Sequence, residues 1–237
     1  MLFIVCTPIG NLDDLSLRQA KTLVNSDIIL AEDTRSAQTL LNACQSRFKF
    51  HPDQIGTNFK FAKLVSYYKE KEFEKLPEII EYLKQNKKVS LISESGMPLI
   101  SEPGYLLVKT VIKEKIPLTV IPGPSAVTAA LAYSGFNPVS KNGGFMFRGF
   151  LPKKPSAVLQ LFNQLKQVKR FFPEMIFVFF ESPQRINNTL RLFVTSEWDP
   201  DIVICREITK KFEEIIRGKA KDLIKRSYKG EITVLVS

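Results

Sequence analysis

The sequence predicts an α/β protein with two domains, the first built on a mostly parallel sheet and the second on a mixed sheet. Two observations lead to this fold class. In the first half of the 237 residues, short apolar runs alternate with segments of helical spacing. Prolines and a glycine gather at residues 117–124, between two halves that are each long enough to bury a core. We therefore expect domains at residues 1–121 and 122–237.

The first half contains predicted strands separated by helices, which is the pattern of a parallel sheet with helical crossovers. The strands are expected at residues 2–6, 28–31, 89–93 and 118–121. Helical spacing begins near Leu17, Leu76 and Tyr105. Pro77 suits the first turn of the second of these helices. Residues 44–63 have no clear period and are expected to form a loop or an insertion.

The second half opens with a helix of small residues at 125–134, which ends at Gly135. A strand, a basic helix, a strand, a helix and two further strands are expected to follow. The approximate bounds are 157–172 for the basic helix and 176–181, 202–206 and 232–236 for the last three strands. Two glycines, Gly143 and Gly144, and two lysines, Lys153 and Lys154, are expected in exposed turns.

The formal net charge of +10 suggests an anionic partner, and its distribution is informative. Residues 1–121 contain 16 Lys and Arg against 14 Asp and Glu, whereas residues 122–237 contain 18 against 10. The positive excess is therefore concentrated in the second half. A generic solubilising surface explains this asymmetry less well than a nucleic-acid partner does.

Composition disfavours membrane and metal proteins. No apolar run approaches eighteen residues, so we expect no membrane span. Cys6, Cys44 and Cys205 lie far apart and match no zinc or haem spacing, which favours reduced thiols in a cytoplasmic protein. His51 is the one histidine, and it is expected in a solvated loop rather than at a metal. We therefore expect no bound metal.

Three turns rich in glycine and proline each follow an apolar strand. They read TPIGN at residues 7–11, SESGMPLISEPGY at 93–105 and PGPS at 122–125. In parallel α/β sheets, ligands bind at the carboxyl ends of strands. Glycine lets the backbone approach a ligand, and proline stiffens the loop. One such turn is ordinary turn chemistry, but three at successive strand ends predict a binding site.

Several common catalytic and nucleotide-binding motifs are missing. The first strand is not followed by G-x-G-x-x-G, and the chain contains no G-x-x-x-x-G-K-[ST]. A Ser-His-Asp triad cannot be assembled around a single histidine in a polar loop. The site is therefore not expected to be a dinucleotide site of the usual kind, a P-loop or a serine hydrolase.

Charged side chains beside two of the strand ends have a structural alternative. In AEDTR, Arg35 follows Asp33, and this acid could equally cap a helix. In FFESPQR, Glu181 and Arg185 surround Ser182, which could equally begin a helix with the proline after it. The two interpretations, a ligand site or a capped helix, remain open for both segments.

The second half adds two groups of charged residues. CREITKKFEE places Arg206, Glu207 and Lys210 after the last long strand, where a salt-bridged surface is the alternative. A basic strip follows aromatic residues at 145–150 and is either a solvated helix face or a phosphate-binding surface beside stacking rings. The strip comprises Lys153, Lys154, Lys166, Lys169 and Arg170, and Arg148 lies among the aromatic residues just before it.

Taken together, these segments resemble a known family. In chain order they read TPIGNLDDLSLRQAKTL, SDIILAEDTR, LISESGMPLISEPGYLLV, PGPSAVTAAL, GFLPKK, FFESPQR and CREITKKFEE. This order resembles that of the RsmI-type ribosomal RNA small-subunit methyltransferases, which belong to the tetrapyrrole methylase superfamily. The resemblance runs from Leu2 to about Val236 and fails mainly over residues 44–75.

The resemblance implies a two-domain tetrapyrrole-methylase-like fold, a homodimer, and S-adenosylmethionine bound in a cleft between the domains. It also implies 2′-O-methylation of a cytidine in the decoding region of small-subunit (16S) rRNA, on naked RNA or on the 30S subunit. The residues that match the family's cofactor-binding positions are Pro8, Ile9, Gly96, Met97, Pro98, Ile100, Ser125, Ala126, Phe180 and Glu181.

Two departures from the family pattern concern the cofactor and the substrate. Relatives read S-D-A-G-T-P where this chain has SESGMP, so Met97 replaces a hydroxyl, and a lost hydrogen bond costs about 1 kcal/mol. Relatives carry S-Y-H-x-H-N-E where this chain has SYYKEKE at residues 66–72. We therefore expect altered cofactor affinity and no role for those histidines.

Methyl transfer to a ribose hydroxyl requires alignment and a group that removes or compensates a proton. Candidates are Glu207 or Lys210 as base or charge stabiliser, with Arg35 and Arg185 on phosphate. The substrate-binding residues are expected to be Arg148, Lys153, Lys154, Arg185 and Arg206. Two alternatives remain: a small-molecule methylase of the same fold, and a non-catalytic RNA- or ribosome-binding protein on a degenerate methylase fold.

Overall fold

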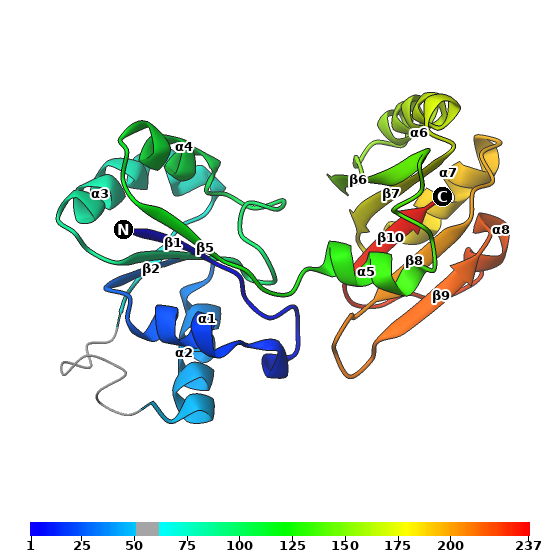
Figure 1. The fold of residues 1–237 in the computed structure, drawn as a ribbon. Coiled ribbons are helices and arrows are strands. Elements are labelled where there is room, and N and C mark those ends of the chain that lie inside the picture. The colour runs from blue at the N-terminus through cyan, green and yellow to red at the C-terminus, as the bar shows by residue number, and fades with distance from the viewer. Residues whose placement is uncertain (51–61) are drawn as a thin grey trace. The chain divides into compact units, whose positions relative to one another are not determined.

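A computed structural model describes residues 1–50 and 62–237, and these form two compact units, Met1–Ser125 and Ala126–Ser237 (Figure 1). This division falls four residues after the boundary that we expected from the sequence. Part of the expected loop at 44–63 is regular structure, because the helix before it runs to Phe48. His51 lies outside the described residues.

Unit 1 contains a five-stranded sheet, here called sheet A, in the order β3-β2-β4-β1-β5. Every pair of neighbouring strands is parallel. The prediction of a parallel sheet is therefore confirmed. The strands are β1 (Leu2–Val5), β2 (Ile28–Ala31), β3 (Lys63–Ser66), β4 (Val89–Ile92) and β5 (Leu118–Ile121).

Helices cover both faces of sheet A. They are α1 (Leu17–Val24), α2 (Thr34–Phe48), α3 (Glu72–Lys84) and α4 (Tyr105–Lys113), with short 3-10 turns at Leu12–Asp14 and Lys69–Lys71. α1 and α2 share one buried apolar cluster, and α3 and α4 share the other on the opposite face (Figure 1). Strand β4 lies between β1 and β2, but its helix α4 packs on the face opposite to α1 and α2. Such a divergence of connections is a topological switch point, where ligands bind in open α/β sheets.

Two expectations about helix starts were tested in unit 1. The side chain of Asp33 accepts a hydrogen bond from the backbone N–H of Arg35 at 2.8 Å, so Asp33 caps α2, as in the capped-helix alternative for AEDTR. Pro77 was expected in the first turn of its helix, and this was wrong, because α3 begins at Glu72. The proline is tolerated because it lies on the exposed side, where water can bind the carbonyl that loses its helical donor.

Unit 2 contains a second five-stranded sheet, sheet B, in the order β6-β7-β10-β8-β9. β6 and β7 are parallel and the other pairs are antiparallel, which confirms a mixed sheet. The strands are β6 (Gly143–Phe150), β7 (Glu174–Glu181), β8 (Ile202–Arg206), β9 (Glu214–Gly218) and β10 (Ile232–Val236). The sequence did not predict β9, an edge strand in which only Ile216 is fully buried, so its pattern does not alternate.

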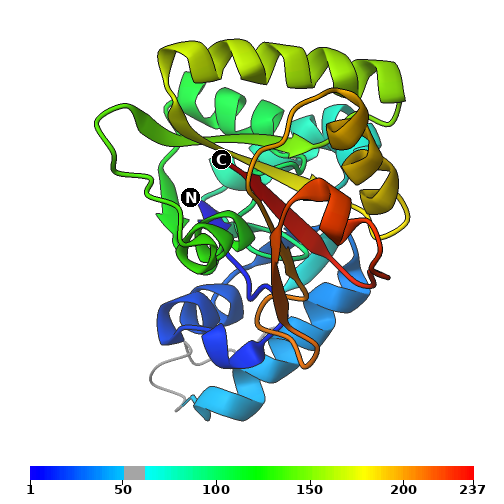
Figure 2. The same ribbon diagram turned by 90° about the vertical axis from the view of Figure 1, so that its right-hand side faces the viewer.

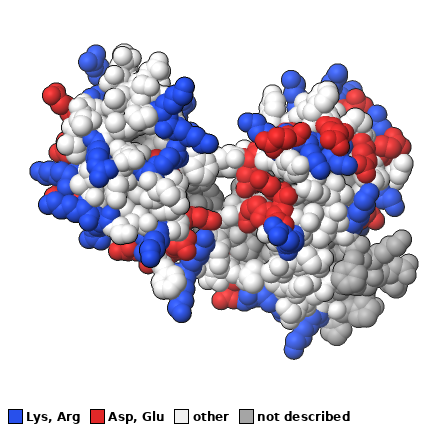
Figure 3. Space-filling model, turned by 180° about the vertical axis from the view of Figure 1, so that it is seen from behind, with Lys and Arg blue, Asp and Glu red and all other residues white. Residues whose placement is uncertain are grey.

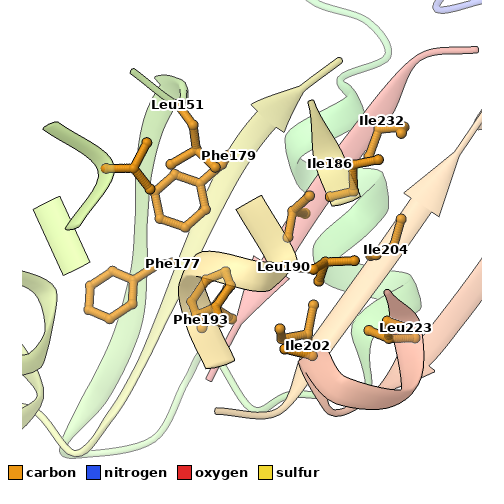
Figure 4. Close-up of a cluster of buried hydrophobic side chains, with 14 of the residues drawn as sticks. Leu151, Phe177, Phe179, Ile186, Leu190, Phe193, Ile202, Ile204, Leu223 and Ile232 are labelled. Atoms are coloured by element: carbon orange, nitrogen blue, oxygen red, sulfur yellow. The ribbon is translucent and has the colours of Figure 1, made fainter. Parts of the chain in front are cut away.

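Helices also cover sheet B. They are α5 (Ala126–Ser134), α6 (Pro155–Phe171), α7 (Ile186–Thr195) and α8 (Ala220–Leu223). α6, α7 and α8 bury the main core of the unit, which Figure 4 shows, and the long yellow-green α6 is seen side-on in Figure 2. In this core the rings of Phe162 and Phe193 stack at 4.1 Å, and Trp198 packs edge-on against Phe162. Helix α5 contacts β8 and β10.

In unit 2 one expected turn was wrong, and one helix cap that the sequence leaves open as an alternative does not form. Gly143 and Gly144 begin strand β6 instead of forming a turn. A side chain at Gly143 would press against the carbonyl of Glu174, so close strand pairing requires this glycine. Ser182 does not cap α7, because its carbonyl oxygen accepts the N–H groups of Arg185 and Ile186 in a turn that precedes the helix.

The structure also bears on the expected cysteine chemistry and membrane topology. Cys6, Cys44 and Cys205 are buried and unpaired. In the described part of the chain, no helix is long and apolar enough to cross a bilayer. The same residues contain no group of three or more His, Cys, Asp or Glu side chains arranged to hold a metal ion.

Candidate functional site

The turns after β1 and β4 are joined by hydrogen bonds at the carboxyl edge of sheet A. The backbone N–H of Thr7 donates to the carbonyl of Gly96 at 2.9 Å, and the N–H of Gly96 donates to Oγ1 of Thr7 at 3.2 Å. The same hydroxyl donates to the carbonyl of Ser93 at 3.2 Å. Thr7 is buried, so these bonds are protected from water. They set the position of one turn relative to the other.

The turn after β5 is held to the same place. The thiol of Cys6 donates to the carbonyl of Pro124 at 3.1 Å. The side-chain amide of Gln19, which is completely buried, donates to the carbonyls of Cys6 at 2.9 Å and Pro122 at 3.4 Å. A side chain at Gly123 would overlap that amide. The third turn therefore requires a glycine and a buried glutamine from α1.

Gly96 lies where all three turns meet. Its φ of +89° is in a region that residues other than glycine rarely adopt. A Cβ at this position would lie 3.2 Å from Cγ2 of Ile9 in the first turn and 3.4 Å from the carbonyl oxygen of Pro124 in the third. The three turns thus form one packed assembly rather than three independent loops.

The structure places the expected cofactor-binding residues in two groups. Seven lie in the three turns of unit 1, and among them Pro8, Ile9 and Pro98 are buried, Met97 is half-buried and Ile100 is exposed. These seven are Pro8, Ile9, Gly96, Met97, Pro98, Ile100 and Ser125. The other three, Ala126, Phe180 and Glu181, belong to unit 2.

Backbone conformation marks two loops as special. Eight described residues other than glycine have a positive φ. Four of them lie just after helices, where left-handed residues commonly end a helix: Lys49, Asn86, Lys115 and Glu197. The other four are Leu99 and Ser101 in the turn after β4, and Glu207 and Thr209 after β8. Strain of this kind tends to gather at functional sites, and the sequence gives no sign of it.

Glu102 is a candidate residue that the sequence analysis missed. Its Oε1 lies 2.7 Å from Oγ of Ser93, the residue that begins the same turn. Burial raises the pKa of Glu102 to about 7, the Ser93 hydrogen bond opposes this, and the nearby Glu32 and Glu94 add to it. The second Ser-Glu pair of SESGMPLISEPGY was the only available signal, and it does not reveal burial.

Arg35 is placed near this edge but is already paired. Its Nε and Nη2 lie 3.0 and 2.7 Å from the two carboxylate oxygens of Asp33. These hydrogen bonds lower the pKa of Asp33 to about 2. The backbone N–H of Asp33 in turn donates to Glu94 at 2.8 Å. The side chain of Arg35 is 90% exposed, so part of its guanidinium still faces solvent.

The candidate residues of unit 2 gather at one edge of sheet B. β7 and β8 are both antiparallel to β10, and Glu181 and Arg206 are both paired with Ile232. Phe150 at the end of β6 is paired with Phe180 in β7. The carboxyl ends of β6, β7 and β8 therefore lie at the same edge, although the segments are far apart in the sequence.

Glu181, which is buried, forms an ion pair with the partly buried Arg185. Arg185 Nη2 lies 2.6 Å from Oε1 of Glu181, and this carboxylate also accepts the N–H of Ser182 and the hydroxyl of Thr189, both at 2.7 Å. Arg185 Nη1 donates to the carbonyl of Leu151 at 3.1 Å. Both side chains are thus occupied within unit 2, where they fix the start of the loop that follows β6.

The basic strip divides into structural and free lysines. Nζ of Lys166 donates to the carbonyl of Ser196 at 2.6 Å, and Nζ of Lys169 donates to that of Pro173 at 2.8 Å. Arg148, Lys153 and Lys154, by contrast, are exposed and make no side-chain hydrogen bond or ion pair with the described residues. The rings of Phe147 and Phe150 contact Phe180 beside them.

The loop after β8 contains a small charge network. Nζ of Lys210 lies 3.2 Å from Glu207 and 3.0 Å from Glu231. The pKa of Glu207 is lowered, mainly because its carboxylate accepts a hydrogen bond from the N–H of Glu231. Burial acts in the opposite direction, and the hydrogen bond from Lys210 lowers the pKa further. Burial opposes the charge on Lys210, but its bonds to Glu231 and Glu207 outweigh burial and raise the pKa of Lys210. Glu207 is therefore a carboxylate and Lys210 an ammonium at neutral pH. Arg206 pairs with Glu214 at 2.9 Å.

The surface charge differs between the units. On the face shown in Figure 3, basic side chains predominate over unit 2, at left, whereas acidic side chains gather on unit 1. This agrees with the excess of Lys and Arg in the second half of the sequence.

We predict that Glu102 makes stability depend on pH. Because its pKa rises from 4.5 to about 7 on folding, the folded state binds more protons than the unfolded state between these values. The free energy of unfolding therefore falls as pH rises through this window. Glu102→Gln, which stays neutral, should be more stable relative to wild type at pH 8 than at pH 5 in urea unfolding. The exposed Glu70→Gln is the control, and an equal difference at both pH values for Glu102→Gln would contradict the assignment.

Comparisons with known proteins agree with these features. The family model for tetrapyrrole (corrin/porphyrin) methylases matches residues 1–224. The chain is 42% identical over 240 residues to "Ribosomal RNA small subunit methyltransferase I" of Thermotoga maritima, covering 100% of this chain and 97% of that protein. It is 37% identical to the protein of the same name from a Hydrogenobaculum strain, covering 100% and 95%.

Solved structures share the fold at low sequence identity. Diphthine synthase matches with a TM-score of 0.68 and 16% identity, over 100% of this chain and 89% of that one. Cobalt precorrin-4 methyltransferase matches with a TM-score of 0.62 and 17% identity, over 100% and 94%. With the family model matching nearly the whole chain, the protein belongs to the tetrapyrrole (corrin/porphyrin) methylase family.

Proposed function

We propose that this chain is an S-adenosylmethionine-dependent methyltransferase that acts on the RNA of the small ribosomal subunit. The observation that carries the proposal is the packed assembly of three turns at the switch point of sheet A, in a chain 42% identical to a ribosomal RNA small subunit methyltransferase. The finer proposal, from the resemblance of the motifs, is 2′-O-methylation of a cytidine in the decoding region.

The residues at the edge of sheet A fit this cofactor chemically. The absence of a Cβ at Gly96 lets the three turns pack closely, and Ile9 and Pro98 offer apolar contacts, as in most small-molecule sites. Glu94 and Glu102 place acidic groups beside them, which suits a cation. S-adenosylmethionine is such a cation, and it supplies an electrophilic methyl group. We propose that the three turns hold it.

Lys210 is the proposed charge stabiliser for the acceptor. A ribose hydroxyl becomes negatively charged as it loses its proton, and a positioned cation favours that change. The raised pKa of Lys210 keeps it charged, and the lowered pKa of Glu207 makes this carboxylate a weak base. Of the two roles considered for this pair, charge stabilisation is therefore the better supported. The contacts of Lys210 with Glu207 and Glu231 hold the loop that carries it, in which Glu207 and Thr209 have positive φ.

RNA binding is assigned to the carboxyl edge of sheet B. Arg148, Lys153 and Lys154 are free to pair with phosphates, and Phe150 beside them is 60% exposed and available for stacking. Arg206 and Arg185 have partners within the unit, and we propose that they support this surface rather than bind phosphate themselves. Arg35 remains a proposed phosphate contact through its exposed face.

The direct test is methyl transfer to 30S subunits that lack the modification, with mapping of the product nucleotide. We expect incorporation at one cytidine 2′-oxygen. Transfer to a tetrapyrrole instead would favour the small-molecule methylase, and no binding of S-adenosylmethionine in calorimetry would favour the non-catalytic binding protein. Sedimentation of the protein alone tests the homodimer that the resemblance implies.

We predict that Gly96→Ala weakens S-adenosylmethionine binding by about tenfold or more, since the added methyl meets Ile9 and Pro124 in a strained backbone conformation. Gly135→Ala is the matched control, because its φ of +75° is similar but no atom lies within 4 Å of the added carbon. Calorimetry measures both. Equal affinities for the two variants would remove Gly96 from the cofactor site.

We predict that Lys210→Ala lowers kcat by roughly a hundredfold, the scale of one stabilising donor, with little change in the KM for S-adenosylmethionine. Lys210→Arg keeps the charge and should retain a substantial part of the rate. Lys211→Ala, an exposed neighbour, is the control. A wild-type rate in Lys210→Ala would exclude the assignment. An inactive Lys210→Arg would indicate that Lys210 acts as a base instead of a charge stabiliser.

We predict that replacing both Lys153 and Lys154 by alanine weakens binding to the 30S subunit and reduces its salt dependence by about 0.7–0.9 per lost phosphate contact on a log–log plot. The matched control replaces Lys221 and Lys225, which are equally exposed in the same unit. Filter binding over a salt series measures both. If the two double variants behave alike, only net charge matters and the proposed surface is wrong.

A further inference from the structure

The N-terminus of helix α4 receives its cap from a distant part of the chain. The helix follows Gly104, which has a φ of +121° and no side chain to accept the free N–H groups of the first turn. Oε1 of Glu72 accepts them instead, from Leu106 at 2.9 Å and from Gly104 at 3.1 Å, with Leu107 at 3.4 Å. A carboxylate at this position also interacts favourably with the helix dipole.

Glu72 is itself held in place. It is the first residue of α3, and the phenol of Tyr67 donates to the same oxygen at 3.1 Å. Tyr67 is 1% exposed, and burial, with the negative charge of Glu72, raises the pKa of its hydroxyl, so the phenol keeps its proton. The segment that follows β3 thus presents one oriented carboxylate oxygen to the start of α4.

This cap holds one end of the loop at residues 93–104. The other end is held by the hydrogen bonds between Thr7 and Gly96. Between the two anchors lie Leu99 and Ser101, whose φ values of +73° and +71° are costly for residues with side chains. A strained segment persists only where its surroundings determine it, and here the surroundings are these two anchors.

We propose that Glu72, oriented by Tyr67, is a positioning residue that keeps the loop at 93–104 in the conformation that binds the cofactor. Glu72 acts through Gly104 and helix α4 rather than by touching the cofactor. The inference rests on the proposed function only in naming what the loop binds. If the anchor is lost, the strain at Leu99 and Ser101 relaxes, and the residues from Gly96 to Ile100 no longer have one defined conformation.

The test compares Glu72→Ala and the isosteric Glu72→Gln with wild type. We expect Glu72→Ala to raise the Kd for S-adenosylmethionine by about tenfold, the scale of one lost cap, with kcat at saturating cofactor nearly unchanged. Glu72→Gln keeps an oxygen acceptor and should lie between them, which also provides a variant that folds if the alanine does not. Glu74→Ala, an exposed acid in the same helical turn, should match wild type.

A purely structural cap gives a different result. It would lower the unfolding midpoint and the fraction of active enzyme but leave the Kd of the folded molecules unchanged. That outcome, or a wild-type Kd in Glu72→Ala, would overturn the proposal. A raised Kd in Glu74→Ala as well would show a general charge effect and would overturn it equally.

Hydrogen exchange without cofactor separates this inference from the proposed function. Glu72→Ala should speed exchange at the amides of Leu106 and Leu107 and in residues 93–104, but not at the amides of β1. If wild type does not bind S-adenosylmethionine, the proposed function fails. Hydrogen exchange still measures whether Glu72 holds the loop at 93–104 in place. Unchanged exchange in the loop would then refute the positioning role.

Discussion

The reciprocal hydrogen bonds between Thr7 and Gly96 are the constraint on which the arrangement of unit 1 at its carboxyl edge depends. They join the turns after β1 and β4 where the chain leaves sheet A toward opposite faces. Gln19 adds the turn after β5 through two backbone carbonyls. Because these groups are buried, each lost bond would leave an unsatisfied polar group, which makes the arrangement rigid. A site that must align a methyl donor benefits from such rigidity.

Unit 2 uses buried charge for a comparable purpose. The ion pair of Glu181 and Arg185 holds the carbonyl of Leu151, and Lys153 and Lys154 follow directly in an exposed bend. The pair therefore orders the loop while the lysines stay free. Lys166 and Lys169 show the opposite use of a basic residue, since both bind backbone carbonyls within the unit. Net charge alone does not distinguish these two kinds of lysine.

The departures from the family motifs have a physical counterpart. Met97 is half-buried in the turn after β4, beside Gly96, whose contacts with the other turns do not involve a hydroxyl at position 97, where the resemblance leads one to expect one. In the stretch at 66–72, where the resemblance leads one to expect histidines, Glu72 caps helix α4 and Tyr67 donates to Glu72. The anchor of the loop is thus formed without any histidine in this stretch.

The sequence by itself determined the fold class, the parallel sheet and the positions of the three glycine- and proline-rich turns, because apolar periodicity, glycine and proline act locally. It also offered the N-cap at Asp33 as one of two interpretations, because this cap involves a neighbour only two residues away. The tertiary structure alone decided the roles of Glu72, Glu102 and Arg185, because their partners are distant along the chain or hidden by burial. The tertiary structure also decided strand β9. Its residues show no alternating apolar pattern, and it is a strand because its backbone pairs with β8.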